Sequence, residues 1–256
     1  MRGPDRTLRF AFESAADAYA SGRPELPLDA VREAATAVRL PPGARVLEVG
    51  AGTGQLTGAL LAAGMQVVAL EPGDALRALA ERRFPDVLFE AATFEEFEPD
   101  RRFDAIFSSN AWHWIDPAVG VERAADTADA LVLLWDTPFV ADAARRRQIQ
   151  TEVMIPHGSE FPSEEPEIRR LVAEQLDAAS ADVVATGRFE ELWRDVRERR
   201  LVYTSGRYVD LVGSMSSVVA SDDRAEVLDG LRRLLGEEPF EVVDLVWTVA
   251  ARAKAS

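Results

Sequence analysis

A glycine-rich turn between an apolar segment and a helical pattern carries the most specific chemical signal in the sequence. Residues 46–55 read Val-Leu-Glu-Val-Gly-Ala-Gly-Thr-Gly-Gln. Glycines allow a sharp turn and a close backbone approach to a ligand, and free N–H groups at the start of a helix can bind an acidic group. A dinucleotide site would need glycine at position 55, which is Gln55, so the spacing disfavours a nicotinamide cofactor. Glu48, on a strand expected to be buried, needs cationic or N–H partners, which the ammonium group of an amino acid or neighbouring backbone can supply.

The elements around this turn predict an α/β fold with a mostly parallel sheet covered on both faces. Short apolar segments alternate with helical patterns. The predicted strands are 45–49, 66–70, 87–89, 103–107 and 131–135, and the predicted helices are 55–63, 75–83 and 117–127. Asp74 and Asp116 are the expected N-caps of the second and third helices, with Pro117 at the first helical position. The right-handed crossover rule makes such a sheet doubly wound, with helices on alternate faces.

The second half of the chain is more helical. Helical patterns at about 140–154 and 166–179 flank a loop at 155–165, and a strand at 197–204, two helical segments within 208–235 and a strand at 240–250 follow. We expect a single domain over 1–256, with a helical insertion at 140–187 after the fifth strand. Such an insertion either roofs the carboxyl edge of the sheet, where ligands bind in these folds, or covers a sheet face.

Composition limits the classes of partner. The 256 residues are 47% hydrophobic and include no cysteine, which fits a reducing environment and a sizeable core. No stretch approaches the roughly 18 apolar residues of a membrane-spanning helix. The net charge of -15 opposes nucleic acid and anionic membranes. We expect a cytoplasmic protein, monomeric or homodimeric, that binds a small molecule and neither nucleic acid nor membrane.

The segment Glu-Val-Gly-Ala-Gly-Thr-Gly resembles motif I of the class I S-adenosylmethionine-dependent methyltransferases, and weaker motifs extend the resemblance over nearly the whole chain. It implies a Rossmann-like, seven-stranded sheet, S-adenosylmethionine as cofactor and S-adenosylhomocysteine as product. One departure is the Pro-Gly-Gly turn that the family usually has before strand five. This chain has Asp-Thr-Ala-Asp at 126–129 instead.

The resemblance assigns a set of cofactor-binding residues. Glu71, which follows the second strand, would bind both ribose hydroxyls through charge-assisted hydrogen bonds. Pro72 and Phe94 would enclose the adenine and Thr93 would bond its edge, although Phe94 can equally belong to the core. The glycine turn would contribute the remaining contacts through Glu48, Gly50, Ala51, Gly52, Gly54 and Gln55.

The N-terminal segment 1–40 resembles the helical lid of small-molecule methyltransferases. The matching pattern is F-x-x-x-A-x-x-Y at 12–19, followed by Arg23 and Pro24. Tyr19 and Arg23 would close over the methionine end of S-adenosylmethionine, because a guanidinium group can pair with the methionine carboxylate. The alternative is an N-terminal helix with Tyr19 and Arg23 on its surface.

Residues 103–116 resemble the S-x-x-A-x-H-W segment of this subfamily, where Ser109 would lie beside the sulfonium. They differ from the N-P-P-Y type of enzymes that methylate exocyclic or amide nitrogens, which again disfavours nucleic acid. His113 would lie where the acceptor arrives, and an imidazole there can act as general base. The alternative is a packed residue that positions a loop.

Four aromatic residues near the strand ends predict an apolar pocket, with ordinary core as the alternative and the favoured one for Trp135. They are Trp112, Trp114, Trp135 and Phe139. His157, in the expected insertion, can also reach such a pocket. A catechol-type metal site needs clustered carboxylates after strand five, where this chain has Asp136-Thr-Pro, so no metal is expected.

The resulting hypothesis is methyl transfer from S-adenosylmethionine to an oxygen or nitrogen of a small, partly apolar molecule. Two alternatives accompany it. One is a protein of the same fold that binds the cofactor without methylating, as a scaffold or a cyclisation catalyst. The other is a nicotinamide oxidoreductase, which Gln55 disfavours.

Overall fold

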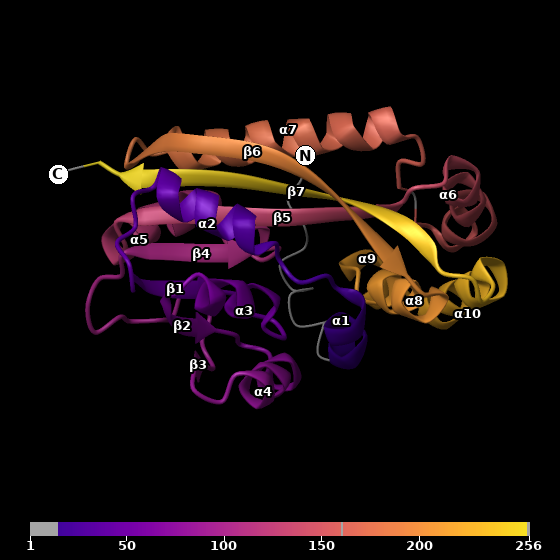
Figure 1. The fold of residues 1–256 in the computed structure, drawn as a ribbon, viewed down its shortest axis with the longest axis horizontal. Helices are drawn as coiled ribbons and strands as arrows, with labels where there is room; N and C mark the ends of the chain where they lie inside the picture. Colours follow the sequence, from indigo (N-terminus) through magenta and orange to yellow (C-terminus); the bar gives the residue numbers. More distant parts are fainter. Residues whose placement is uncertain (1–14, 160, 255–256) are drawn as a thin grey trace.

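The computed structural model describes residues 15–159 and 161–254, which form a seven-stranded sheet between two layers of helices (Figure 1). The strand order is β3-β2-β1-β4-β5-β7-β6. β1 to β5 pair in parallel, and β7 is antiparallel to both of its neighbours. This arrangement confirms the predicted doubly wound, mostly parallel sheet. The strands are β1 (Arg45–Val49), β2 (Gln66–Leu70), β3 (Leu88–Glu90), β4 (Ala105–Ser109), β5 (Ala130–Val140), β6 (Phe189–Tyr203) and β7 (Phe240–Ala253).

Helices cover both faces of the sheet through apolar side chains. One face packs against α2 and α3, with Val31, Leu56 and Leu60 in the interface. The other face packs against α5 and α7. Within the described residues, no helix has both the length and the apolar character needed to cross a bilayer. The helices are α1 (Ala16–Gly22), α2 (Leu28–Ala37), α3 (Gln55–Ala62), α4 (Asp74–Arg83), α5 (Pro117–Thr127), α6 (Ala143–Ile149), α7 (Glu165–Ala185), α8 (Ser205–Gly213), α9 (Ser216–Val219) and α10 (Arg224–Leu235), with short turns η2 (Trp112–Trp114), η3 (Gln150–Met154) and η4 (Ile155–His157).

The strand order reverses between β1 and β4, which opens a crevice at the carboxyl edge of the sheet. The glycine turn leaves β1 at this point. The backbone N–H groups of Gly50 and Ala51 both donate to the carbonyl of Leu70 at 3.0 Å, which holds the turn against the end of β2. The topology therefore brings the motifs at the ends of β1, β2 and β4 to one edge.

Several predicted strand boundaries are wrong. β3 is shifted by one residue, and Phe103 forms only an isolated bridge with Ala128, so β4 begins at Ala105. β5 continues to Val140, where a helix was expected, because every residue from 130 to 140 pairs with β7.

β6 begins at Phe189, eight positions before the predicted strand. Charged side chains on both of its faces conceal the alternation of a strand, as is common at a sheet edge. Two of these side chains pair across the strands, with Arg199 at 2.8 Å from Asp244 and Arg200 at 2.6 Å from Glu241, whereas Arg197 pairs with Glu33 of a neighbouring helix. Only the folded structure supplies these partners.

The predicted N-cap at Asp74 is also wrong. α4 begins at Asp74 itself, and Gly73 occupies the N-cap position without a side-chain bond. Asp74 instead pairs with Arg77 in the first turn. Pro117 begins α5 as predicted, and the carbonyl of Asp116 accepts the N–H of Gly120 at 2.7 Å.

The long strands β5, β6 and β7 extend past the parallel sheet and carry a separate group of helices (Figure 1, right). α8 and α10 pack there on side chains such as Val140, Tyr203 and Val242. The segment expected as an insertion contains the end of β5, α6, the short turns and α7. α7 packs on the sheet through Ile168 and Val172.

Candidate active site

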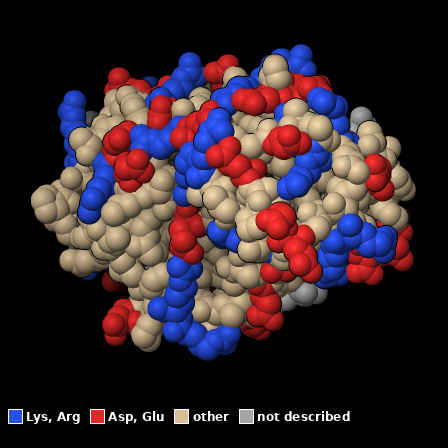
Figure 2. All heavy atoms as spheres, turned by 45° about the vertical axis from the view of Figure 1, so that its right-hand side comes forward, with Lys and Arg blue, Asp and Glu red and all other residues tan. Residues whose placement is uncertain are grey.

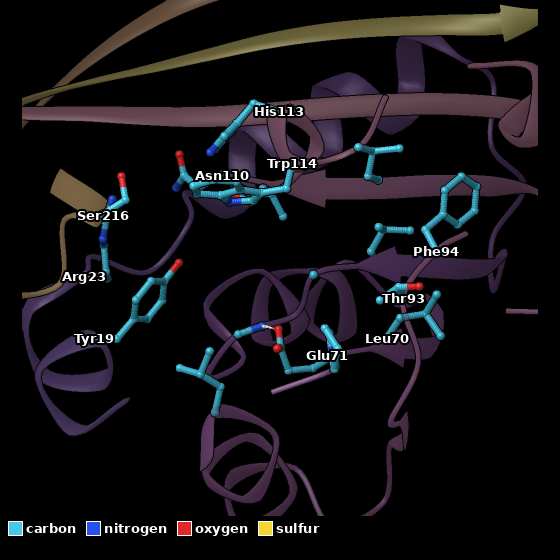
Figure 3. Close-up of a pocket in the computed structure, with 18 of the residues that line it drawn as sticks. Tyr19, Arg23, Leu70, Glu71, Thr93, Phe94, Asn110, His113, Trp114 and Ser216 are labelled. Carbon is cyan, nitrogen blue, oxygen red and sulfur yellow. Dashed lines mark hydrogen bonds between the residues drawn. The ribbon is translucent and has the colours of Figure 1, made fainter. Parts of the chain in front are cut away.

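A pocket of about 420 Å³ lies at the carboxyl edge of β1, β2, β4 and β5 (Figure 3). Ten of the residues assigned from the sequence line it, from five separate segments. They are Tyr19, Arg23, Gly50, Gly52, Glu71, Pro72, Thr93, Phe94, Ser109 and His113. The fold thus brings together residues that are up to 94 positions apart, counted from Tyr19 to His113. Phe12, the first residue of the lid pattern, lies outside the described residues.

Gly50 is required by space and by its backbone conformation, and Gly52 by its backbone conformation. Gly50 has φ +74° and a Cβ there would lie 2.3 Å from the Cβ of Ala111. Gly52 has φ +58° and a Cβ would lie 3.4 Å from the ring of Tyr19. Gly54 serves the fold instead: it is the N-cap of α3, and a Cβ would meet the ring of Phe84 at 2.6 Å, away from the pocket. Side chains at Gly50 and Gly52 would therefore fill the space beside the turn.

Glu71 is held rigidly in the pocket wall. Its Oε2 accepts the backbone N–H of Gly52 at 2.8 Å (Figure 3), and its Oε1 accepts that of Gly73, also at 2.8 Å. Each carboxylate oxygen can accept a further hydrogen bond. The side chain can therefore bind two adjacent hydroxyl groups while it also joins the first glycine turn to the end of β2.

One end of the pocket is an apolar slot. Leu70, Pro72 and Phe94 line it, and the hydroxyl of Thr93 donates to Glu96 at 2.8 Å, so the hydroxyl oxygen can still accept. Phe94 is only 2% exposed, and its ring centroid lies 5.6 Å from that of Trp112. The side chain of Phe94 therefore belongs both to the core and to the pocket wall.

The opposite end is polar and is built around Asp136, which lies within β5. The Arg23 guanidinium lies 3.8 Å from its Oδ2, and the Asn110 amide donates to its Oδ1. Arg23 also donates through Nε to Ser214 at 3.2 Å. Asn110 has φ +52°, a strained conformation for a residue other than glycine. The sequence analysis assigned neither Asn110 nor Asp136 to the cofactor site, although a polar residue directly after β4 and a carboxylate within the apolar β5 were usable signals.

Two buried oxygens at this end have no hydrogen-bond partner among the described residues. They are Oγ of Ser109 and Oδ2 of Asp136. Buried polar atoms are nearly always paired, so both atoms are expected to bind a ligand or ordered water. Among all the residues that the structure describes, no group of three or more His, Cys, Asp or Glu side chains is placed to hold a metal ion.

Glu48, Ala51 and Gln55 line a narrow recess beside the pocket rather than the pocket itself. The Glu48 carboxyl is 1% exposed and accepts the hydroxyl of Thr57 at 2.6 Å, and the backbone N–H of Thr57 also stabilises its charged form, which agrees with the expected N–H partner. Burial raises the pKa of Glu48 from its usual 4.5 to about 8, against the hydrogen bond from Thr57.

This shift predicts a specific pH dependence of stability. The unfolded carboxyl ionises at its usual pKa whereas the folded one stays protonated, so Glu48 lowers stability as pH rises from 4.5 to about 8. Glu48→Gln is expected to stabilise the cofactor-free protein above that window by on the order of 4 kcal/mol and to change little below it. Urea unfolding at several pH values measures this. The exposed Glu237→Gln is the control, and an equal pH slope in wild type and Glu48→Gln would exclude the effect.

His113 extends from η2 into the pocket and is exposed there (Figure 3). Its Nδ1 accepts a hydrogen bond from Trp135 Nε1 at 3.4 Å. The surrounding protein and then the charge of Arg23 lower the pKa of His113 to about 4. The ring is therefore neutral at physiological pH.

The remaining predicted aromatic residues divide between pocket and core. Trp114 lines the pocket, whereas Trp112 and Phe139 are buried in the core and Trp135 stacks on Trp247 at 4.3 Å. His157 lies outside the pocket lining, with Nδ1 3.3 Å from Asp223. Later segments that the sequence analysis did not assign complete the wall. They are Phe161, Gln175, Met215, Ser216 and Ser217.

Comparison with known proteins agrees with this geometry. A family model described as a methyltransferase domain matches residues 46–131, from β1 to the start of β5. An uncharacterized methyltransferase of Mycobacterium tuberculosis is 29% identical over 241 residues, which cover 91% of this chain and 89% of that protein. Residues 46–131 therefore form a methyltransferase domain, in agreement with the resemblance to the class I S-adenosylmethionine-dependent methyltransferases.

A solved structure shows the same fold for a related chain. It comes from Anaeromyxobacter dehalogenans, is described as a candidate type II methyltransferase, and superposes with a TM-score of 0.63 at 22% identity. The match covers 90% of this methyltransferase and 97% of that chain. The methyltransferase is an enzyme that uses S-adenosylmethionine, which supplies a methyl group already activated on a positively charged sulfur.

Proposed function

We propose that this methyltransferase transfers a methyl group to an oxygen or nitrogen of a small, partly apolar molecule. The observation that supports the proposal most directly is the pocket, which continues past the glycine turn and Glu71 into a second part. Trp114, Phe161, Gln175 and residues 215–217 line that part. We call it the acceptor half. Its mixed aromatic and hydroxyl lining suits a small molecule with an apolar body and a polar end.

The residues of the other part fit the cofactor. The slot of Leu70, Pro72 and Phe94 would hold the adenine, and the Glu71 carboxylate would bind the ribose. Arg23 and Asp136, opposite charges 3.8 Å apart, match the carboxylate and ammonium of the methionine end. Ser109, whose buried Oγ is unpartnered among the described residues, is available for the same end.

The enclosed pocket supports a mechanism in which the enzyme mainly aligns the methyl donor with the acceptor and excludes water. Displacement at a methyl group needs donor and acceptor in line, and exclusion of water protects the reaction. Around the pocket lie Tyr19 of α1, Arg23 directly after α1, Phe161 of the insertion and Met215 before α9. We assign to α1 and to the insertion the role of a roof, and to His113 a role at the acceptor.

A small molecule fits the surface better than a polyanion. The net charge is -15, and Figure 2 shows basic and acidic side chains interspersed across one face of the molecule. A phosphate backbone would meet acidic groups on such a surface. We therefore propose no nucleic acid or membrane partner.

A binding and transfer experiment tests the proposal. S-adenosylhomocysteine is expected to raise the melting temperature of the purified protein, and NAD is expected to leave it unchanged. S-adenosylmethionine with a labelled methyl group should then label one member of a panel of small alcohols, phenols, carboxylic acids and amines. RNA and protein are tested as acceptors in parallel reactions. Methyl label found only in the RNA or the protein would exclude a small-molecule acceptor.

A further inference from the structure

The hydrogen bond between His113 and Trp135 determines which ring nitrogen of His113 carries a proton. An indole N–H can only donate, and Trp135 Nε1 lies 3.4 Å from His113 Nδ1. The indole is buried and stacked on Trp247 at 4.3 Å between centroids, so it has little freedom to turn away. Nδ1 is therefore the acceptor, and in the neutral ring the proton lies on Nε2.

His113 consequently presents an N–H donor to the pocket. Its pKa of about 4, lowered by desolvation in the surrounding protein and by the charge of Arg23, keeps the ring uncharged and makes it a weak base. A base with so low a pKa has little tendency to take a proton from a hydroxyl, a phenol or an ammonium group. Hydrogen-bond donation is the interaction that this tautomer offers an acceptor.

The other polar groups of the acceptor half do not supply a strong base either. Gln175, Ser216 and Ser217 are uncharged side chains that can donate hydrogen bonds. Asp136 is held by the Asn110 amide and faces the Arg23 guanidinium at 3.8 Å. The remaining pocket carboxylates lie with the cofactor-binding residues, Glu71 after β2 and Glu95 after β3. This lining therefore suits a methyl acceptor that binds through hydrogen-bond donors and has no proton to lose before it reacts.

We propose that the methyl acceptor carries a carboxylate, and that Nε2–H of His113 binds one carboxylate oxygen while the other oxygen takes the methyl group. The inference rests on the proposed function. The attacking oxygen forms a C–O bond as the C–S bond breaks, and the electron pair of that bond stays on sulfur. A carboxylate and a sulfonium become a neutral ester and a thioether, so charge balances and no proton moves.

An amine acceptor fits less well. Its single lone pair cannot both accept the hydrogen bond from His113 and attack the methyl group, whereas a carboxylate has lone pairs on two oxygens. A phenol would first have to lose its proton, for which this tautomer of His113 provides no acceptor atom.

Nitrogen-15 NMR of histidine-labelled protein tests the proton position without any acceptor. The chain has two histidines, so His157→Gln leaves the His113 signals alone. We expect the pattern of the Nε2–H tautomer, and Trp135→Phe should mix the two tautomers. A wild-type ring protonated on Nδ1, or charged at neutral pH, would overturn the proposal.

The labelled product tests the acceptor. S-adenosylmethionine with a labelled methyl group is incubated with the enzyme and either a panel of carboxylic acids, phenols and amines or a small-molecule cell extract. A methyl ester releases the label as methanol in alkali, whereas methyl ethers and methylamines retain it. Label that alkali does not release would overturn the proposal.

Variants at His113 separate donation from proton removal. His113→Ala should raise the KM for the acceptor by about tenfold to a hundredfold, because a hydrogen bond to a charged group is lost. His113→Gln, which keeps an N–H donor but cannot serve as a base, should retain most of the activity. Inactivity of His113→Gln with normal S-adenosylhomocysteine binding would contradict donation. Failure of the wild type to bind S-adenosylhomocysteine would instead contradict the proposed function.

Discussion

Replacing Glu71 with alanine should weaken S-adenosylhomocysteine binding by about a hundredfold or more. Two charge-assisted hydrogen bonds to the ribose would be lost, each worth about 1.5–3 kcal/mol. The product is the better probe than the cofactor, because it carries no net charge and so does not respond to a general change in pocket charge. Isothermal titration calorimetry on wild type and variant measures the difference.

The control for Glu71 is Glu95→Ala, which removes another carboxylate of the same pocket wall. We expect this variant to keep most of the affinity. Because Glu71 also accepts N–H groups from Gly52 and Gly73, the melting temperature of each variant must be compared as well. A folded Glu71→Ala protein with wild-type affinity would refute the ribose assignment.

Gly22→Ala should displace α1 and with it the two residues assigned to the methionine end. A Cβ on Gly22 would lie 2.2 Å from the backbone nitrogen of Leu211 in α8, and backbone atoms cannot move aside as a flexible side chain can. Overpacking of this kind costs about 1–3 kcal/mol. The carbonyl of Gly22 also accepts the Tyr203 hydroxyl at 2.9 Å, so the contact between α1 and the sheet would be disturbed.

We expect Gly22→Ala to lower the melting temperature and to weaken S-adenosylhomocysteine binding by about tenfold or more, because Arg23 follows directly. Gly206→Ala is the matched control. It adds a methyl group to α8 itself, but a Cβ at position 206 meets nothing within 4 Å. Unchanged binding in Gly22→Ala would show that the position of α1 does not matter for the cofactor.

Local sequence predicted which residues of the glycine turn and of the end of β2 meet at one edge of the sheet. Gly50, Gly52 and Glu71 follow directly after strands, and each of their roles depends on backbone geometry within a few residues. Parallel strands place such positions at one edge by topology. Consequently the pocket wall formed by these residues followed from spacing alone.

The acceptor half could not be predicted in the same way. The sequence analysis used Asp136 only to argue against a catechol-type metal site. Residues 215–217 belong to no motif. They reach the pocket because β5, β6 and β7 extend beyond the parallel sheet and carry α8 and α9 back toward its edge. Pairing between β5 and β7, which are separated by about a hundred residues, leaves no short-range pattern.

The amino-acid pattern was sufficient for the α/β class, the glycine turn, the acidic residue after β2 and the family, because these features depend on contacts between near neighbours along the chain. The protonated nitrogen of His113, the ion pair of Arg23 with Asp136 and the burial of Glu48 depended on the three-dimensional arrangement. Charge state and hydrogen-bond direction are set by whichever groups lie within a few ångströms, and in this protein those groups come from distant segments.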